Sequence, residues 1–555
     1  MKQLSIILLL TCSFLSQCSK KSDGPTPPVT PPATLNIASV NIDGIQNATE
    51  YINIKPSTSI KVAFTAPLNT ASVPGSIVLT DRDNVVYPLT IGFQNNDSVL
   101  IATPSTPLKF LTHYTFTVAT TLTSKNNGKL NSNTSIQFFT RIDSTDKFPR
   151  ISDDSLLTLV QKQTFKYFWD FGHPISGLAR ERNSSGDVVT SGGSGFGVMA
   201  IITGIHRSFI TRAEGLARLQ KMVTFLKDKA QTFHGAYPHW LNGITGAVIP
   251  FSNKDDGADL VETSYLLQGL LTARQYFTGT DPAESAFRND VNTIWDGVQW
   301  NWFRQNNQDI LYWHWSPTFN WEMNHPIRGW NEALITYALA ASSNTYSIPK
   351  SVYDNGWAWG GMIENNNIYY GIQLPLGPSL GGPLFFAHYS FLGINPNQLT
   401  DAYADYWKQN KNHTLINYSY SVANPKGYFG YSNSVWGLTA SDIRNGYTAS
   451  SPTNDVGVIA PTAALSSFPY TPLESMRALK FYYYVLGDKL WKEYGFVDAF
   501  SLSDEWYANS FLAIDQGPII IMIENYRSGL LWNLFMSAPE IKRGLRNLGF
   551  QSPNI

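Results

Sequence analysis

The sequence predicts a chain of two parts, an all-β sandwich followed by a larger all-α domain, on three observations. With 555 residues, the chain is too long for one ordinary hydrophobic core. Between residues 35 and 142, short runs of alternating apolar and polar residues are separated by Asn, Asp, Gly and Pro. From residue 152 to 549, apolar residues recur at the spacing of a helix face.

The β part is predicted from strand candidates at 59–64, 98–101, 114–118 and 136–140. Regular short strands with turn signals between them favour a sandwich of two sheets. The region has neither an aromatic cluster suited to a sugar nor a constellation of polar residues. We therefore expect a spacer, with glycan binding as the alternative.

The α part is predicted to contain about a dozen helices, more than a usual single core needs. Two capping boxes, 211–214 and 471–474, mark helix starts. Helix pairs arranged as a closed toroid suit this count, although periodicity does not prove closure. The expected helices include 193–207, 258–278, 282–303, 328–342, 398–411, 457–467, 516–535 and 538–547.

Residues 1–34 predict export. An apolar stretch at 4–15 is too short to span a bilayer as a mature helix, and it ends at the lipobox-like sequence LSQC. Residues 1–18 are therefore interpreted as a lipoprotein signal peptide with Cys18 as the acylated residue; a plain signal peptide is the alternative, because Gln17 replaces the usual small residue. Residues 19–34 are rich in proline, which favours an extended linker. We expect an outer-membrane lipoprotein that faces the periplasm or the cell exterior.

Charge and cysteine content exclude several classes of function. Lys and Arg total 40 and Asp and Glu total 41, a balance that gives no reason to expect nucleic acid as a partner. The only cysteines are Cys12 and Cys18, so the folded part has no disulfide and no Cys-based zinc site. No recognised metal-ligand spacing appears, and we expect no metal, no cofactor and a monomer.

Residues 254–271, KDDGADLVETSYLLQGLL, combine four acids with the start of an apolar helix. Asp255, Asp259 and Glu262 fall at i, i+4 and i+7 and could line one face at the helix entrance. One acid at a helix N-terminus simply caps the helix and complements its dipole. Four acids so close together repel one another, so a functional interpretation stands beside the structural one.

Residues 311–340 carry four tryptophans beside His, Arg and Glu side chains. A buried Trp is normally part of the core, but prolines and asparagines make most of this stretch a loop. Flat aromatic faces can stack on the C–H faces of a sugar while polar side chains pair with its hydroxyls. Glu332 then opens the apolar helix that follows, which repeats the arrangement at Asp259.

Asp515 is a lone carboxylate between apolar runs, again at a predicted helix start. Desolvation would raise its pKa and the helix dipole would lower it. Glu524 is expected to be a structural partner of Arg527 or of a backbone group. Acids beside aromatic loops suit hydrolysis of a glycosidic bond, which needs one carboxylic acid for the leaving oxygen and one carboxylate to activate water.

Six longer motifs carry a family resemblance: GGSGFG at 192–197, YPHWLNG at 237–243, DLVETSY at 259–265, GPLFFAHY at 382–389, WGLTASD at 436–442 and DQGP at 515–518. They resemble the glucoamylase-like domain of exported Bacteroidetes proteins over residues 152–549, and residues 35–142 resemble bacterial Ig-like domains. That family includes endo-β-1,2-glucanases (glycoside hydrolase family 144). The resemblance implies an (α/α)6 toroid and hydrolysis of a β-1,2-glucan with inversion of the anomeric centre.

The resemblance also implies roles for individual residues. Glu332 matches the candidate general acid, and Asp515 is our choice for the carboxylate on the water side. An inverting pair would place its two carboxyl groups about 6.5–9.5 Å apart. Asp255, Asp259 and Glu262 match an acidic cluster in the same pocket. The expected sugar contacts are Trp240, His239, Trp313, Trp315, Arg328 and His388.

Two other functions stay open. A non-catalytic glycan-binding protein would need the aromatic platform but not the acids. A polysaccharide lyase would use His388 and Tyr389 as base and acid on a uronic sugar. Lyases need basic residues that face the carboxylates of the substrate, whereas the clusters here are acidic and aromatic. The glycines at 193–197 lack the βαβ context of a nucleotide site.

Overall fold

The computed structural model describes residues 34–555 and divides into two compact units, one ending at Ile142 and the other beginning at Asp143. The predicted signal peptide, Cys18 and residues 19–33 of the predicted linker lie outside the described residues. Among residues 34–555, no helix has both the length and the apolar character needed to cross a bilayer.

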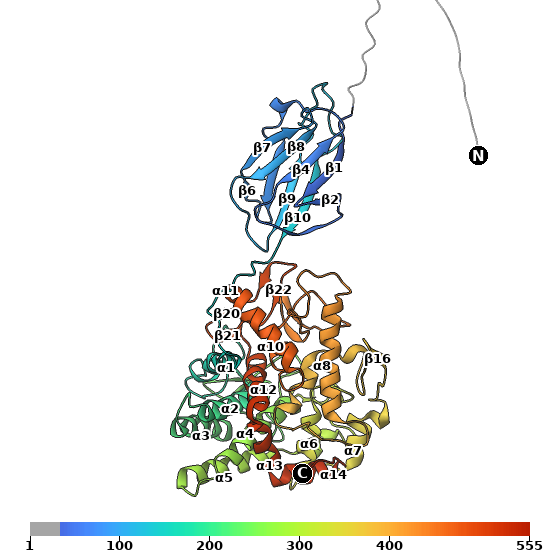
Figure 1. The fold of residues 1–555 in the computed structure, drawn as a ribbon. Helices are drawn as coiled ribbons and strands as arrows, with labels where there is room; N and C mark the ends of the chain where they lie inside the picture. The colour runs from blue at the N-terminus through green and yellow to red at the C-terminus, as the bar shows by residue number, and fades with distance from the viewer. Residues whose placement is uncertain (1–33) are drawn as a thin grey trace, which may run out of the picture. The chain divides into compact units, whose positions relative to one another are not determined.

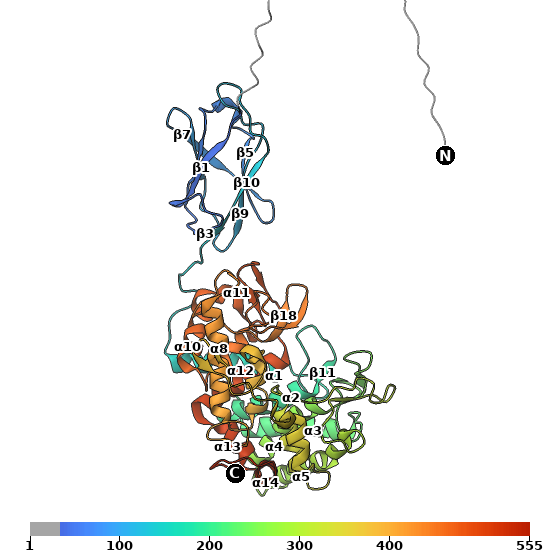
Figure 2. The same ribbon diagram turned by 90° about the vertical axis from the view of Figure 1, so that its right-hand side faces the viewer.

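The N-terminal unit is a sandwich of two five-stranded sheets, as the alternating pattern predicted (Figures 1 and 2). The strand orders are β2-β1-β4-β8-β7 and β3-β10-β9-β5-β6, and the pair β10–β3 is parallel. Alternate side chains such as Ile60, Val62 and Phe116 are fully buried in the core between the sheets. The strands are β1 Ile37–Ile42, β2 Ile45–Gln46, β3 Tyr51–Ile54, β4 Ile60–Phe64, β5 Ile77–Asp81, β6 Val86–Tyr87, β7 Leu89–Gln94, β8 Val99–Pro104, β9 His113–Val118 and β10 Thr134–Thr140.

The C-terminal unit is built from helices joined by long loops that carry short two- and three-stranded sheets. Its α-helices are α1 Asp153–Trp169, α2 Ser191–His206, α3 Arg212–Asp228, α4 Leu260–Tyr276, α5 Pro282–Gly297, α6 Leu334–Ser342, α7 Lys350–Val352, α8 Tyr406–Ala423, α9 Pro461–Leu465, α10 Pro472–Lys480, α11 Gly487–Leu490, α12 Ala513–Ser528, α13 Leu530–Ser537 and α14 Pro539–Asn547. The loop strands are β11 Val188–Thr190, β12 Trp240–Asn242, β13 Val248–Ile249, β14 Ala258–Asp259, β15 His314–Trp315, β16 Ile368–Tyr369, β17 Ile372–Gln373, β18 Ala440–Ile443, β19 Gly446–Ala449, β20 Trp491–Lys492, β21 Gly495–Phe496, β22 Phe500–Ser501 and β23 Trp506–Tyr507.

An inner set of helices forms the centre of this unit. Helix α2 packs against α4 and α12 (Figures 1 and 2). Helix α4 packs against α6, and α12 packs against α9 and the short helix Ser390–Leu392. Glycines of the motif at 192–197 allow α2 and α4 to approach closely, because a Cβ on Gly195 would lie only 2.1 Å from the carbonyl oxygen of Tyr265 on α4. The outer helices α1, α3 and α5 cover the inner ones, since α1 contacts α2 and α12 while α3 and α5 contact α2 and α4.

Several helix boundaries differ from the sequence prediction. Helix α6 begins at Leu334, so Glu332 lies in the loop before it rather than in the first turn. Helix α8 begins after Asp405, whose side chain caps it by accepting the N–H of Lys408, and the predicted helix at 398–411 was therefore placed too early. Gly529, with φ of 68°, separates α12 from α13 within the predicted helix at 516–535.

The two predicted capping boxes have different outcomes. At Thr211 the capping box is present, because the threonine side chain and Glu214 each bond the other's backbone. At Thr471 the side chain makes no cap bond to the helix; its hydroxyl instead lies 3.3 Å from the carbonyl oxygen of Ser467. The prediction of a capping box at 471–474 is therefore wrong.

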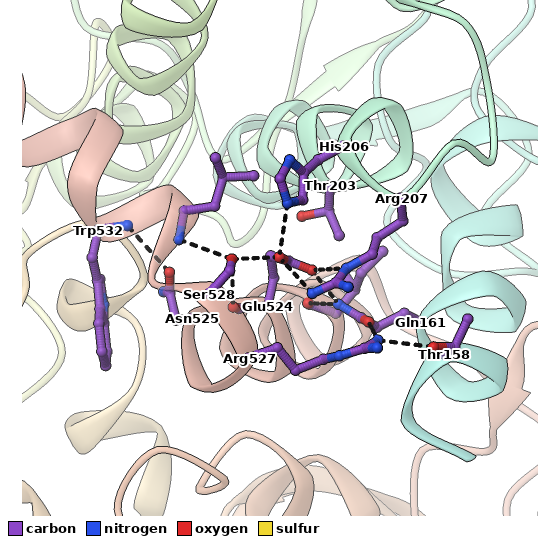
Figure 3. A network of polar contacts seen from close by, with 12 residues as sticks. Thr158, Gln161, Thr203, His206, Arg207, Glu524, Asn525, Arg527, Ser528 and Trp532 are labelled. Atoms are coloured by element: carbon purple, nitrogen blue, oxygen red, sulfur yellow. Dashed lines mark hydrogen bonds and ion pairs between the residues drawn. The ribbon is translucent and has the colours of Figure 1, made fainter. Parts of the chain in front are cut away.

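Glu524 on α12 anchors a buried polar network that joins three helices (Figure 3). Its carboxylate accepts hydrogen bonds from Arg207 at 2.7 and 2.9 Å, from Gln161 at 2.9 Å and from Ser528 at 2.6 Å. Arg527, the partner expected from the sequence, instead donates to Gln161 at 2.7 Å and to residues of α1. Glu524 is thus a structural residue, as predicted, with Arg207 as its ion-pair partner.

Candidate active site

Helix α4 begins immediately after Asp259, whose side chain caps the helix. Oδ1 accepts the backbone N–H groups of Val261 and Glu262 at 3.0 and 2.9 Å, and Oδ2 lies 3.1 Å from Nδ1 of His239. Burial would raise the pKa of Asp259, but the hydrogen bond from His239 and the nearby His314 hold it below its ordinary value. Asp259 therefore stays ionised and fixes both the helix start and the imidazole.

His239 lies between an aromatic ring and the acids. Phe251 stacks on its imidazole with a centroid distance of 4.1 Å and an interplanar angle of 20°. Burial opposes a charged imidazolium, but the carboxylates of Glu262 and Asp259 outweigh it and raise the pKa of His239 to about 9. At neutral pH His239 is therefore a cation, held in place by the ring of Phe251 and by the carboxylates of Asp259 and Glu262.

Glu262, in the first turn of α4, reaches across to the start of α2. Its Oε2 accepts the backbone N–H of Gly192 at 2.9 Å, and its Oε1 lies 3.9 Å from Nε2 of His239. A Cβ at Gly192 would lie 2.3 Å from that carboxylate, so only glycine fits there. Burial raises the pKa of Glu262 above its ordinary value, and Asp259 adds to this against the opposing charge of His239.

Asp255 and His314 complete this acidic cluster behind the cavity wall. Pairing of β14 with β15 places His314 opposite Asp259, and its Nε2 lies 3.5 Å from Oδ2 of Asp255. Burial and the charge of Asp259 raise the pKa of Asp255 to about 7, and burial lowers the pKa of His314 to about 4. His239, Asp255 and Asp259 also offer ligand atoms within 4.8 Å of one another, a spacing that would admit a metal ion.

Glu332 approaches the same cluster from the loop before α6. Its main-chain carbonyl accepts hydrogen bonds from Ser390 and from the hydroxyl of Tyr265. Burial, with smaller contributions from the charges of Glu262 and Asp259, raises the pKa of its carboxyl group to about 7. Glu332 can therefore carry a proton near neutral pH.

The carboxylates of Glu262 and Glu332 face a cavity of about 400 Å³. Aromatic rings make up much of its wall, which suits a sugar ring, and a few polar groups remain to fix orientation. Residues from both loops and helices contribute to it. The wall includes Glu181, Arg182, Thr190, His239, Trp240, Phe251, Tyr265, Trp313, Phe385, Tyr389, Tyr447, Leu512 and Ile514.

Asp515, in the first turn of α12, lies next to this cavity but does not line it. Its neighbours Leu512 and Ile514 line the wall, and its side chain is 1% exposed. No donor among the described residues reaches either carboxylate oxygen; the partner is the carboxyl group of Asp498, which can bond it only when one of the two is protonated. Burial and this like charge raise the pKa of Asp515 well above its ordinary value and that of Asp498 to about 7.

Asp442 and Arg182 connect this acid pair to the cavity. The backbone N–H of Asp442 donates to Asp498 Oδ2 at 2.7 Å, and the Asp442 carboxylate accepts from Arg182 at 3.2 Å. The Nε of Arg182 is also 3.0 Å from both oxygens of Glu181. Two acids thus hold the guanidinium rigidly at the cavity wall.

Of the predicted site residues, the structure brings Glu332, Glu262, His239, Trp240 and Trp313 to the cavity wall. Asp255, Asp259 and Asp515 lie directly behind it.

Three predicted sugar contacts lie elsewhere. His388 is 2% exposed and bonds Ser467 at 3.0 Å, and burial lowers its pKa to about 3. Trp315 packs edge-on against Trp302, at a centroid distance of 5.4 Å. Arg328 is exposed and lies over the ring of Trp359. None of the three is among the residues that line the cavity.

Sequence reasoning missed Phe251, Tyr447, Glu181 and the acid pair's second member, Asp498. Phe251 lies in a loop and Tyr447 in the short strand β19, and neither belongs to a helical periodicity; Asp498 stands alone between apolar residues without a helix start beside it. The tyrosine of the motif GPLFFAHY lines the cavity, although its neighbouring histidine does not.

Comparisons with known proteins agree with this geometry. A family model described as putative glucoamylase matches residues 324–539, and one described as bacterial Ig-like domain matches residues 38–140. The solved structure of a putative glucoamylase from Bacteroides uniformis is 57% identical to this chain, with a TM-score of 0.73. The match covers 74% of this chain and 100% of that one. The endo-β-1,2-glucanase of Chitinophaga pinensis, solved with sophorotriose and glucose, is 52% identical with a TM-score of 0.72 and covers 73% of this chain and 100% of its own.

A curated relative is the exo β-1,2-glucooligosaccharide sophorohydrolase (non-reducing end) of Parabacteroides distasonis, 47% identical over 420 residues. The match takes in 72% of this chain and spans 58% of the length of that relative.

The helical fold and the acid-bearing aromatic cavity define the class of protein, a helical domain of the glycoside hydrolase type. The chain belongs to the family described as putative glucoamylase, and its N-terminal unit is a bacterial Ig-like domain.

Proposed function

We propose that the protein is an endo-β-1,2-glucanase. The observation that carries this proposal is Glu332, whose carboxyl group lines an aromatic cavity and has a pKa of about 7. A general acid must hold its proton at the pH of the reaction and release it to the leaving oxygen. The relatives that act on β-1,2-glucan supply the linkage, and the Chitinophaga enzyme, matched over its whole chain, supplies the endo mode.

Glu332 would protonate the glycosidic oxygen while a water molecule attacks the anomeric carbon from the other face, which inverts the configuration. Asp515 would take the proton of that water. Because Asp515 does not line the cavity, we infer that this proton passes through at least one intervening hydroxyl or water. Burial, and after it the like charge of Asp498, raises the pKa of Asp515 above its ordinary value, which makes its ionised form a stronger proton acceptor.

The acidic cluster at the start of α4 would have two roles: one member would bind the substrate, and the others would hold that member in position. Glu262 faces the cavity and can accept hydrogen bonds from sugar hydroxyls, while Asp259 and His239 fix its surroundings. The lyase alternative is disfavoured, because His388, its proposed base, is buried and hydrogen-bonded to Ser467.

The remaining proposals concern architecture and location. We infer that the inner elements α2, α4, α6, Ser390–Leu392, α9 and α12 close into an (α/α)6 toroid. The contacts of α2 with α4, of α4 with α6, of α6 with Ser390–Leu392, and of α12 with Ser390–Leu392, α9 and α2 support this closure. We also propose that a signal peptide exports the protein, that Cys18 anchors it to the outer membrane, and that it acts as a monomer.

The test is incubation of the purified protein with linear β-1,2-glucan, with products followed by chromatography beside two variants. Glu332→Gln should abolish product formation. Glu322→Gln, which alters an exposed glutamate paired with Lys254, should leave it unchanged. A ladder of oligosaccharides supports endo action, whereas sophorose alone would indicate exo action. Full activity in Glu332→Gln would show that Glu332 is not the general acid. No product from the wild-type protein would overturn the proposed function.

A further inference from the structure

A second hollow, with a volume of about 520 Å³, adjoins the active-site cavity. The two share Arg182 and Tyr447 in their walls. Tyr447 stands on the β18–β19 hairpin and is 48% exposed. The second hollow therefore continues the cavity past these two side chains, and Asp442 is part of its wall.

Trp506 offers this hollow an aromatic face. It stands on the β22–β23 hairpin, opposite Ser501, and is half-buried. The two tryptophans of the cavity wall are already engaged: the ring of Trp313 stacks on His325 at a centroid distance of 5.1 Å, and that of Trp240 packs edge-on against Phe251 at 4.9 Å. No aromatic or cationic group among residues 34–555 stacks on Trp506, so its face is available to a ligand.

Polar groups with spare hydrogen-bonding capacity surround that face. Asn509 is exposed and its main-chain carbonyl accepts from Asn183 at 3.1 Å, while its side-chain amide has no hydrogen bond within the described residues. Arg182 donates from Nε to Glu181 and from one terminal nitrogen to Asp442. Its other terminal nitrogen has no hydrogen-bond partner among residues 34–555. An aromatic face beside donors and acceptors is the combination that recognises a sugar.

We propose that the second hollow is a distal subsite, in which Trp506 stacks on a glucosyl unit of a chain that continues from the active-site cavity. This inference rests on the proposed function, because it assigns the same substrate to the neighbouring hollow. Stacking there would add binding free energy only for chains long enough to extend past Arg182 and Tyr447.

The experiment compares kcat/KM on linear β-1,2-glucooligosaccharides of increasing length. In the wild-type protein kcat/KM should rise with length until the second hollow is filled. Trp506→Ala should lower it roughly fivefold or more on long chains, the effect of one lost stacking contact, and leave the shortest cleaved chain unchanged. Asn509→Ala should give a smaller loss with the same dependence on length. Trp359→Ala removes an exposed tryptophan that lines neither hollow and should change nothing.

The outcomes separate this inference from the proposed function. An equal loss on short and long chains in Trp506→Ala, or no loss on either while Asn509→Ala is also unaffected, would overturn the distal subsite but keep the enzyme. A wild-type protein that cleaves no β-1,2-glucan of any length would instead overturn the proposed function. If Trp506→Ala does not fold, Asn509→Ala alone decides, because its exposed side chain can be removed without opening the core.

Discussion

Nδ1 of His239 lies 3.1 Å from Oδ2 of Asp259, and this bond ties the cavity wall to the start of helix α4. The half-buried imidazole faces two carboxylates, so it binds its proton more tightly in the folded protein than in the unfolded chain. The proton on His239 is therefore part of the stability of the site.

The first prediction concerns the pH dependence of that stability. The pKa of His239 rises from an ordinary value of 6.5 to about 9 in the fold. Its stabilisation is therefore complete below pH 6.5 and is lost as the pH rises through 9. We expect the free energy of unfolding to fall by about 3 kcal/mol between these limits. His239→Gln should remove most of this slope in urea titrations at pH 6.5 and pH 9.5, and an unchanged slope would contradict the assignment.

The second prediction concerns the pH dependence of catalysis. Glu332 must be protonated to act as the acid, and its carboxyl group has a pKa of about 7. We expect kcat/KM on β-1,2-glucan to decline above about pH 7 as this group ionises. Glu332→Gln should reduce activity by about 10²-fold or more and leave no such alkaline decline in the residual rate. An alkaline limb that persists in the variant would assign it to another group.

Sequence reasoning placed Asp259, Glu262 and Asp515 at helix starts because each obeys a local rule, whereas Glu332 lies in the loop before its helix. Asp259 caps a helix, and Asp515 and Glu262 lie in first helical turns, so spacing and dipole arguments could find them. The partners could not be found in the same way. Asp498 meets Asp515, and Glu524 meets Arg207, across contacts that only tertiary packing creates. His388 failed for the converse reason: the sequence showed a polar residue beside a cavity tyrosine, but not that its ring points into the core.

The third prediction separates the two members of the second acid pair. Asp498 raises the pKa of Asp515 through its like charge, after the larger effect of burial. Asp498→Asn removes that charge, so Asp515 should ionise at lower pH and the acidic limb of the kcat/KM profile should shift downward. Asp515→Asn should instead lose about 10²-fold or more in kcat at every pH. If Asp498→Asn leaves the acidic limb in place, Asp515 does not titrate as the base.

The fourth prediction concerns the network of Figure 3, which lies outside the cavity. Burial would raise the pKa of Glu524, but Arg207, Ser528 and Gln161 outweigh it and hold the pKa below its ordinary value. Its contribution to stability is therefore present above the ordinary value of 4.5 and is lost as the pH falls through the lowered value.

Glu524→Gln would leave the guanidinium of Arg207 without its partner between α2 and α12, and we expect a loss of about 3 kcal/mol near neutral pH. Glu322→Gln, which breaks an exposed pair with Lys254, should cost under about 1 kcal/mol and serves as the matched control. Urea unfolding of both variants at pH 7, followed by circular dichroism of the helices, measures the difference. As the pH falls below the lowered pKa of Glu524, the difference in unfolding free energy between Glu524→Gln and the wild type should narrow, because protonation weakens the wild-type ion pair as well. Equal stability of the two variants at pH 7 would show that the network orients the helices without stabilising their packing.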